Sequence, residues 1–162
     1  MTGRESLEEI VVDDARKIIN YRNNDIYIYE LDENAIKAYS DLFIKDGSAE
    51  KYLDLNLFQN KFAMKNIARI SRHMGYPNNE NILGILLRGL QDANWPFFEE
   101  FIDTLVVAYP RNILINTIDE TLLIADEDED YMWVSGLFIL SERLKVNKSE
   151  LKNMSIFDKR DF

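Results

Sequence analysis

The sequence predicts an all-α fold of stacked antiparallel helical hairpins. Apolar residues recur at the three-to-four spacing of amphipathic helices along most of the chain, and polar caps and glycines punctuate these stretches. Only residues 26–31 have the β-branched and aromatic composition of a strand. Because one strand has nothing to pair with, we interpret residues 26–31 as an extended connector or an irregular helix.

The N-terminal part of the chain contains two predicted helices. Ser6 and Glu9 have the spacing of a capping box, and apolar residues follow at helical spacing as far as Ile19. Asp32 is placed to cap a second helix, whose apolar residues lie between positions 35 and 43. Gly47 supplies the left-handed residue that ends this helix.

The middle of the chain continues the pattern. Asn60 can cap a helix whose apolar stripe lies between residues 63 and 74 and which ends at Gly75. Asn78 or Asn79 then opens a helix that is rich in Leu and Ile as far as residue 90. Asn94 can cap the next helix, with a proline in its first turn where a missing amide costs nothing.

Three more helices are expected towards the C-terminus. Pro110 precedes a helix with apolar residues between 114 and 123, and an acidic loop at 126–130 separates it from a helix around Trp133 that reaches Leu144. A short helix over residues 148–154 closes the chain. The four helices between residues 78 and 145 are each expected to be roughly 12–15 residues long, and short turns make neighbouring helices antiparallel.

Length and composition bound the possible functions. The 162 residues, 46% hydrophobic and 30% charged, fit a single folded domain. The absence of cysteine excludes disulfides, thiolate metal sites and cysteine nucleophiles. No apolar run approaches the roughly 20 residues of a membrane span, and the acidic N-terminus is unlike a signal peptide, so we expect a cytoplasmic protein.

The negative charge is concentrated in one part of the sequence. Residues 75–130 contain twelve acidic residues and only two basic ones, both arginines, and this difference equals the whole net charge of −10. A nucleic-acid-binding protein needs clustered Lys and Arg, so this function is disfavoured, whereas a basic protein partner is permitted. A solvated face that aids solubility is the competing interpretation. The residues expected to bind the partner are Glu99, Glu100, Asp103, Asp119, Glu120, Asp126, Glu127, Asp128, Glu129 and Asp130.

Spacing suggests how these acids are arranged. Glu100 and Glu120 lie ten residues on either side of Pro110, so an antiparallel hairpin would place them at the same height. Glu99 and Asp103 form a like-charged i,i+4 pair, which disfavours an isolated helix. We expect a partner to relieve this repulsion.

A run in the middle of the chain resembles a known family. Residues 86–96 read Leu-Leu-Arg-Gly-Leu-Gln-Asp-Ala-Asn-Trp-Pro, which is similar to the Leu-Leu-x-x-Leu-Gln-Asp-x-Asn-Trp-Pro hallmark of an uncharacterised bacterial family of small helical domains. A downstream tryptophan helix around Trp133 also fits, and the resemblance covers residues 61–144. It implies HEAT-like helical packing and no established activity; related proteins often occur in toxin–immunity cassettes. Trp95 is expected to be buried between hairpins, with its indole N–H on an acceptor.

The sequence offers no convincing catalytic or metal site. His73 is the only imidazole, and no nucleophile motif accompanies it. Asp126, Asp128 and Asp130 occupy positions 1, 3 and 5 of a calcium loop, but Tyr131 and Leu137 stand where glycine and the bidentate glutamate are required. No glycine-rich phosphate loop is present. We therefore expect no cofactor, no metal and no catalytic residues.

These observations favour a non-enzymatic protein-interaction module. The specific expectation is a bacterial immunity protein whose acidic face neutralises a basic toxin domain. The alternative is an anti-defence inhibitor, of the anti-CRISPR or anti-restriction type, that mimics nucleic acid with the same face. A third possibility, a small hydrolase or metal enzyme, requires a pocket that gathers acids with His73.

Overall fold

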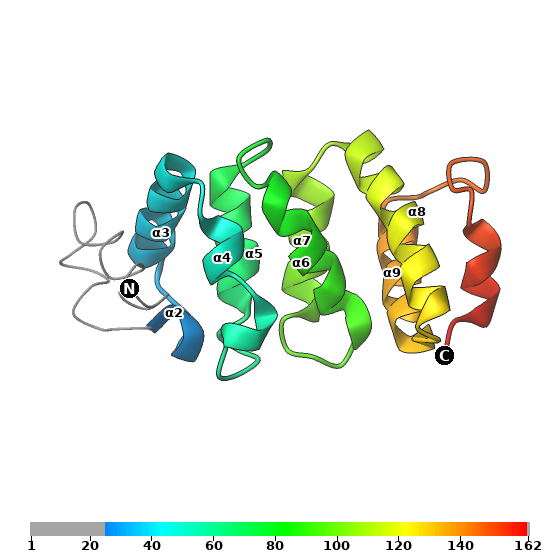
Figure 1. The fold of residues 1–162 in the computed structure, drawn as a ribbon, viewed down its shortest axis with the longest axis horizontal. Coiled ribbons are helices and arrows are strands. Elements are labelled where there is room, and N and C mark those ends of the chain that lie inside the picture. The colour runs from blue at the N-terminus through cyan, green and yellow to red at the C-terminus, as the bar shows by residue number, and fades with distance from the viewer. Residues whose placement is uncertain (1–24, 162) are drawn as a thin grey trace. The chain divides into compact units, whose positions relative to one another are not determined.

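A computed structural model describes residues 25–161, and every element of secondary structure in that range is helical (Figure 1). The predicted all-α class is confirmed. The predicted helix that starts at Ser6 lies outside the described residues. The chain, predicted to be one domain, groups into two compact units, Met1–Ile82 and Leu83–Phe162. Each unit is described by itself below.

The first unit is organised around two helices that pack against each other, α3 and α5. Asp32 caps α3 as predicted: its side chain accepts a hydrogen bond from the amide of Ala35 at 2.9 Å. Gly47 ends α3 in the left-handed conformation, with φ of 69°. The elements of this unit are α2 (Asp25–Ile28), α3 (Glu33–Asp46), α4 (Ala49–Tyr52), η2 (Leu55–Leu57), α5 (Lys65–Met74) and η3 (Glu80–Ile82).

One buried amide, that of Asn66 on α5, fixes the chain between α2 and α3. Its Oδ1 accepts from the backbone N–H of Leu31 at 3.0 Å, and its Nδ2 donates to the carbonyls of Ile26 at 2.9 Å and Tyr29 at 2.7 Å. These bonds satisfy backbone groups that an irregular segment cannot satisfy alone. The strand-like residues 26–31 are thus a four-residue helix and a connector, one of the two interpretations offered above.

The predicted start of α5 is partly wrong. Asn60 does accept from the amide of Ala63 at 2.8 Å, but this bond caps a turn, and the α-helix begins only at Lys65. Its C-terminus is at Gly75, with φ of 67°, as predicted. Asn79, one of the two predicted starts of the next helix, directly precedes η3, and its carbonyl accepts from the amide of Ile82 at 3.0 Å. Its side chain is buried, and its Nδ2 donates to the carbonyl of Ser71 at 3.0 Å.

The second unit is built around α9, which contacts α7, α8, η4 and η5. Several of its apolar residues are completely buried, among them Phe101, Leu114, Ile118 and Leu137. The elements of this unit are α6 (Leu83–Arg88), η4 (Gly89–Gln91), α7 (Phe98–Ala108), α8 (Arg111–Glu127), α9 (Tyr131–Arg143) and η5 (Met154–Lys159). No helix within residues 25–161 has both the length and the apolar character needed to cross a membrane.

The contact between α9 and η4 is unusually close because a glycine lies in it. A Cβ on Gly136 would lie 1.9 Å from the carbonyl oxygen of Leu90. Three residues earlier on α9, Trp133 is 3% exposed and donates its indole N–H to the carbonyl of Leu87 at 2.9 Å. Trp133 therefore takes the role of buried anchor that was predicted for Trp95. Trp95 is only partly buried, and its ring lies 5.2 Å from that of Phe97 at an interplanar angle of 34°.

Three other predicted helices differ from the structure in their bounds. Asn94 does not cap α7, which begins at Phe98 without a side-chain cap; Asp92 instead accepts from the amide of Asn94 and stabilises the turn. The closing helix lies at Met154–Lys159 rather than at residues 148–154. The predicted helix over residues 78–90 is divided into η3, α6 and η4.

Candidate protein-interaction surface

The ten acids predicted to bind a partner occupy three places in the second unit. Glu99, Glu100 and Asp103 lie in the first half of α7, and Asp119 and Glu120 lie in the middle of α8. Residues 126–130 form the end of α8 and the turn to α9. Five of the ten acids have partners within this unit and five do not, so the structure divides the set evenly.

The first internal partner is Arg143, at the end of α9. Its guanidinium lies 3.3 Å from a Glu99 carboxylate oxygen and 3.0 Å from one of Asp103. The expectation that a bound protein must relieve the repulsion between these acids is therefore unnecessary, because Arg143 is placed between them. The three side chains are exposed, so the ion pairs contribute little to stability.

Three further acids hold neighbouring segments in place. Asp119 accepts from the backbone amides of Lys152 and Asn153, at 3.1 and 2.9 Å, and so fixes the segment before η5. Asp126 pairs with Lys159 of η5 at 2.8 Å, and this carboxylate raises the pKa of the lysine. Asp130 caps α9 by accepting from the amide of Trp133 at 3.0 Å.

The other five acids have no ion-pair partner within residues 25–161. Glu120, Glu127, Asp128 and Glu129 are exposed, and Glu100 is partly buried. No described Lys or Arg lies within the 4.0 Å that would form an ion pair with any of them. We call Glu120, Glu127, Asp128 and Glu129, which all belong to α8 or to the turn that follows it, the unpaired acids.

The turn after α8 is a Schellman motif with a glutamate in the position that favours glycine. The amide of Asp130 donates to the carbonyl of Ala125 at 2.9 Å, and that of Glu129 donates to the carbonyl of Asp126 at 3.1 Å. Glu129 has φ of 54°, a conformation that costs a non-glycine residue roughly 1 kcal/mol or more. Glu127 and Asp128 also face the negative end of the α8 dipole, where carboxylates are unfavourable. Asp128 and Glu129 also precede the N-terminus of α9, whose positive end favours carboxylates, and Glu129 adds to the effect of Asp126 in raising the pKa of Lys159.

The packing of α7 differs from the predicted hairpin. Its main contacts in the second unit are with α6, η4 and α9, whereas those of α8 are with α6, α9 and η5. Glu100 and Glu120 were predicted to lie at the same height because α7 and α8 were expected to form a hairpin. The contact between α7 and α8 is not a main contact of either helix. The helix that contacts α8 most is α9, which follows it across the short turn at residues 128–130.

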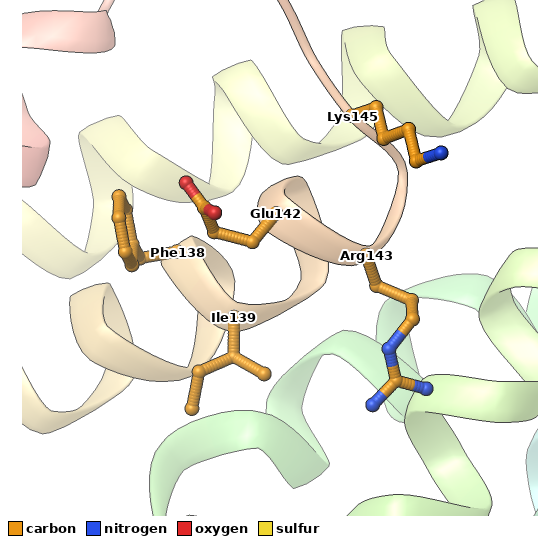
Figure 2. Close-up of a pocket in the computed structure, with 5 residues that line it drawn as sticks. All are labelled: Phe138, Ile139, Glu142, Arg143 and Lys145. Atoms are coloured by element: carbon orange, nitrogen blue, oxygen red, sulfur yellow. The ribbon is translucent and has the colours of Figure 1, made fainter.

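Two hollows among the described residues of the second unit do not resemble an active site. One, of about 450 Å³, is open and lies along the end of α9 (Figure 2). Its only carboxylate, Glu142, is directed away from Arg143, which turns towards its own acids on α7. A second open hollow, of about 500 Å³, lies beside Arg111 and Glu150, which are paired with each other at 3.0 Å. Neither brings two carboxylates together for acid–base chemistry.

His73 takes part in a surface ion-pair cluster of the first unit. Its Nε2 lies 3.3 Å from Glu33, which also binds Arg69 at 2.7 Å. The hydrogen bond from Arg69, followed by that from His73, holds the pKa of Glu33 below its usual value. No group of three or more potential metal-binding side chains occurs within residues 25–161.

Sequence reasoning missed one group of residues on α8. Leu123 and Ile124 are 46% and 45% exposed, although the periodicity assigned Leu123 to the buried stripe. They lie between Glu120 and Glu127 on the same side of the helix. The signal was present in the sequence, because residues 120, 123, 124 and 127 share one helical face and residues 118, 122 and 125 share the opposite one.

The resemblance at residues 86–96 has no independent support. A comparison with protein-family models, with curated proteins and with solved structures finds no match to this chain. The function proposed below is therefore argued from the geometry of the chain itself, and the resemblance enters only as an analogy.

Proposed function

We propose that this protein is a non-enzymatic interaction module that binds a basic protein through the unpaired acids. The observation that carries the proposal is the division of the ten acids. Those that stabilise the fold have cations or amides as partners, whereas the unpaired acids are exposed and lie at the end of α8. A surface whose charges all have the same sign attracts an oppositely charged partner and accelerates its association.

Solubility is the competing explanation, and it does not account for where these acids lie. A solubilising carboxylate serves equally well at any exposed position. Glu127 lies in the last turn of α8, where a carboxylate opposes the helix dipole, and Glu129 adopts a left-handed conformation, so these two residues occupy positions that cost folding stability. Binding a cationic surface would compensate for such costs.

The most specific form of the proposal is a bacterial immunity protein that neutralises a basic toxin domain. The resemblance at residues 86–96 supports this form by analogy. The alternative, nucleic-acid mimicry by an anti-defence inhibitor, uses the same acids. Leu123 and Ile124 favour the first form, because two exposed aliphatic side chains resemble nothing on a phosphate backbone.

The test begins with the protein that binds this chain in extracts of its own host. We expect that protein to be basic and to cross-link to residues 120–129. Protection of cells from its toxicity is expected for an immunity protein, whereas competition with DNA or RNA for its surface would favour the mimic. An acidic binder, or cross-links confined to the first unit, would contradict the proposal.

Charge variants then test the surface. The triple variant Glu127→Gln/Asp128→Asn/Glu129→Gln leaves Asp126 and Asp130 to hold the turn. We expect association to slow about tenfold at low salt and to depend less on salt, because steering by exposed charges is screened beyond about 8 Å at physiological ionic strength. The matched control removes three other exposed acids of the second unit, Glu142, Asp158 and Asp161. If the two triple variants slow association equally, the rate depends only on the net charge of the protein and not on the position of the acids.

A further inference from the structure

The outer face of α8 combines apolar and acidic side chains in one stripe. We define this face as Asn112, Asn116, Glu120, Leu123, Ile124 and Glu127, all of which are exposed. At 100° per residue they fall within about one third of the helix circumference. The opposite side of α8 carries the buried residues Leu114, Ile118 and Leu122. The two sides are thus clearly distinguished.

Other parts of the second unit leave this face uncovered. The C-terminal segment packs along a neighbouring flank of α8, where Asp119 binds Asn153 and Asp126 binds Lys159. Those two acids lie about 100° around the helix from Glu120 and Glu127. Leu123 lies about 40° from Asp119 and about 60° from Asp126, so it marks the edge of the outer face next to the bound segment. The hollow beside Arg111 and Glu150 is lined in part by Asn112 and Asn116 of this face, whereas neither of the two hollows described above includes Leu123 or Ile124.

Extending the proposed function above, on which this inference rests, we infer that the outer face of α8 binds a basic amphipathic helix of the partner protein. Leu123 and Ile124 would contact aliphatic side chains of that helix, and Glu120 and Glu127 would pair with Lys or Arg on either side. The two glutamates are seven residues apart, or roughly 10 Å along the axis. This separation spans two turns of a partner helix. An exposed helix face with aliphatic side chains between acidic ones suits packing of one helix on another.

The pattern of charge determines the kind of partner. Asn112, Asn116 and the two aliphatic residues are neutral, so every charge on the outer face is negative. Asp128 and Glu129 extend that charge beyond the end of α8. A cationic helix without apolar side chains would leave Leu123 and Ile124 in water, and an apolar helix without cations would desolvate the glutamates. Only a helix with both kinds of side chain satisfies the whole face.

Three synthetic peptides test the inference directly. The first is a helical peptide of Leu and Lys with its leucines on one face; the second has the same lysines with alanine in place of leucine; the third has glutamate in place of lysine. Binding is measured by fluorescence anisotropy, and the site is located by amide chemical shifts of the full chain. We expect only the first peptide to bind well and to shift amides of residues 116–129.

Two double variants separate the apolar and ionic contributions. Leu123→Ser/Ile124→Ser and Glu120→Gln/Glu127→Gln should each weaken binding of the Leu/Lys peptide about five- to tenfold. The controls are Val107→Ser, at the most exposed aliphatic residue of α7, and Glu142→Gln/Asp158→Asn, which makes the same charge change elsewhere. These should change binding less than twofold. Circular dichroism confirms that each variant is folded.

The possible failures are distinguishable. If the Ala/Lys peptide binds as tightly as the Leu/Lys peptide and the serine variant changes nothing, the apolar contact is refuted while the acidic interaction surface survives. If shifts map away from α8, the outer face is refuted. If no cationic peptide binds in a salt-dependent manner, both this inference and the proposed function fail.

Discussion

Replacing Gly136 with alanine tests the packing of the second unit most directly. The new Cβ would lie 1.9 Å from the carbonyl oxygen of Leu90, 2.9 Å from its carbonyl carbon and 3.1 Å from its Cβ. Two of these atoms are backbone, so no side-chain rotation relieves the overlap. Helix α9 and η4 must separate by more than 1 Å, by comparison with the 3.5–4.0 Å of ordinary contacts.

The magnitude follows from two opposing effects. Alanine is favoured over glycine in a helix interior by about 1 kcal/mol. Overpacking a close contact costs about 1–3 kcal/mol or more, and the separation also strains the 2.9 Å bond from Trp133 to the carbonyl of Leu87, whose loss costs about 1–3 kcal/mol. The net destabilisation should be about 2–4 kcal/mol, which lowers the melting temperature of a chain of this size by roughly 5–15 °C.

Thermal melts followed by far-UV circular dichroism measure the effect, and Gly84→Ala is the matched control. Gly84 lies in α6, is exposed, and has no atom within 4 Å of an added Cβ. That substitution should leave stability unchanged or raise it by up to about 1 kcal/mol. A Gly136→Ala variant as stable as the Gly84→Ala variant would refute the close contact between α9 and η4.

Three further predictions concern single polar residues. Asn66→Leu leaves three buried backbone groups without their bonds, so it should lower the free energy of unfolding by about 2–4 kcal/mol in a denaturant titration. Glu129→Gly should raise the free energy of unfolding by about 0.5–1 kcal/mol and therefore raise the melting temperature. Glu129→Gln should not, because only glycine relieves the strain of the left-handed backbone. The hydrogen bond from the backbone amide of Asn147, followed by that from Arg111, lowers the pKa of Glu150 from its usual 4.5. The ionised Glu150 therefore stabilises the fold fully above pH 4.5, and this contribution is lost as the pH falls through the pKa of the folded state. Glu150→Gln should therefore flatten the loss of stability below about pH 4, and an unchanged pH profile would contradict this assignment.

Local signals in the sequence were sufficient for the helices that have their own caps. Asp32 and Gly47 delimit α3 as predicted, because a cap depends only on residues within the same turn. Local signals were insufficient where a distant residue supplies the partner, so residues 26–31 were left between two interpretations and Trp95 was expected in the place that Trp133 takes. Asn66 determines the course of residues 26–31 from 35 positions away, and no local pattern indicates this. The same holds for Trp133, whose acceptor lies on α6.

The candidate surface shows the same limit. The excess of acids was visible in the sequence. All ten were predicted to form one binding surface, because no Lys or Arg lies next to them in the chain. Arg143 and Lys159 come from 40 and 33 residues away, so their pairing with Asp103 and Asp126 is a tertiary effect. Helical periodicity was enough to separate Glu120 and Glu127 from Asp119 and Asp126, since adjacent residues differ by 100°.

The burial of Trp133 has a spectroscopic consequence. Both tryptophans of the chain, Trp95 and Trp133, belong to the second unit, whereas the first unit contains tyrosines such as Tyr39 and Tyr52. Selectively excited indole fluorescence therefore monitors the second unit alone, while circular dichroism monitors helices of both. If the two signals change together during unfolding, the chain behaves as one cooperative system. If they separate, the difference assigns a stability to each unit without cutting the chain.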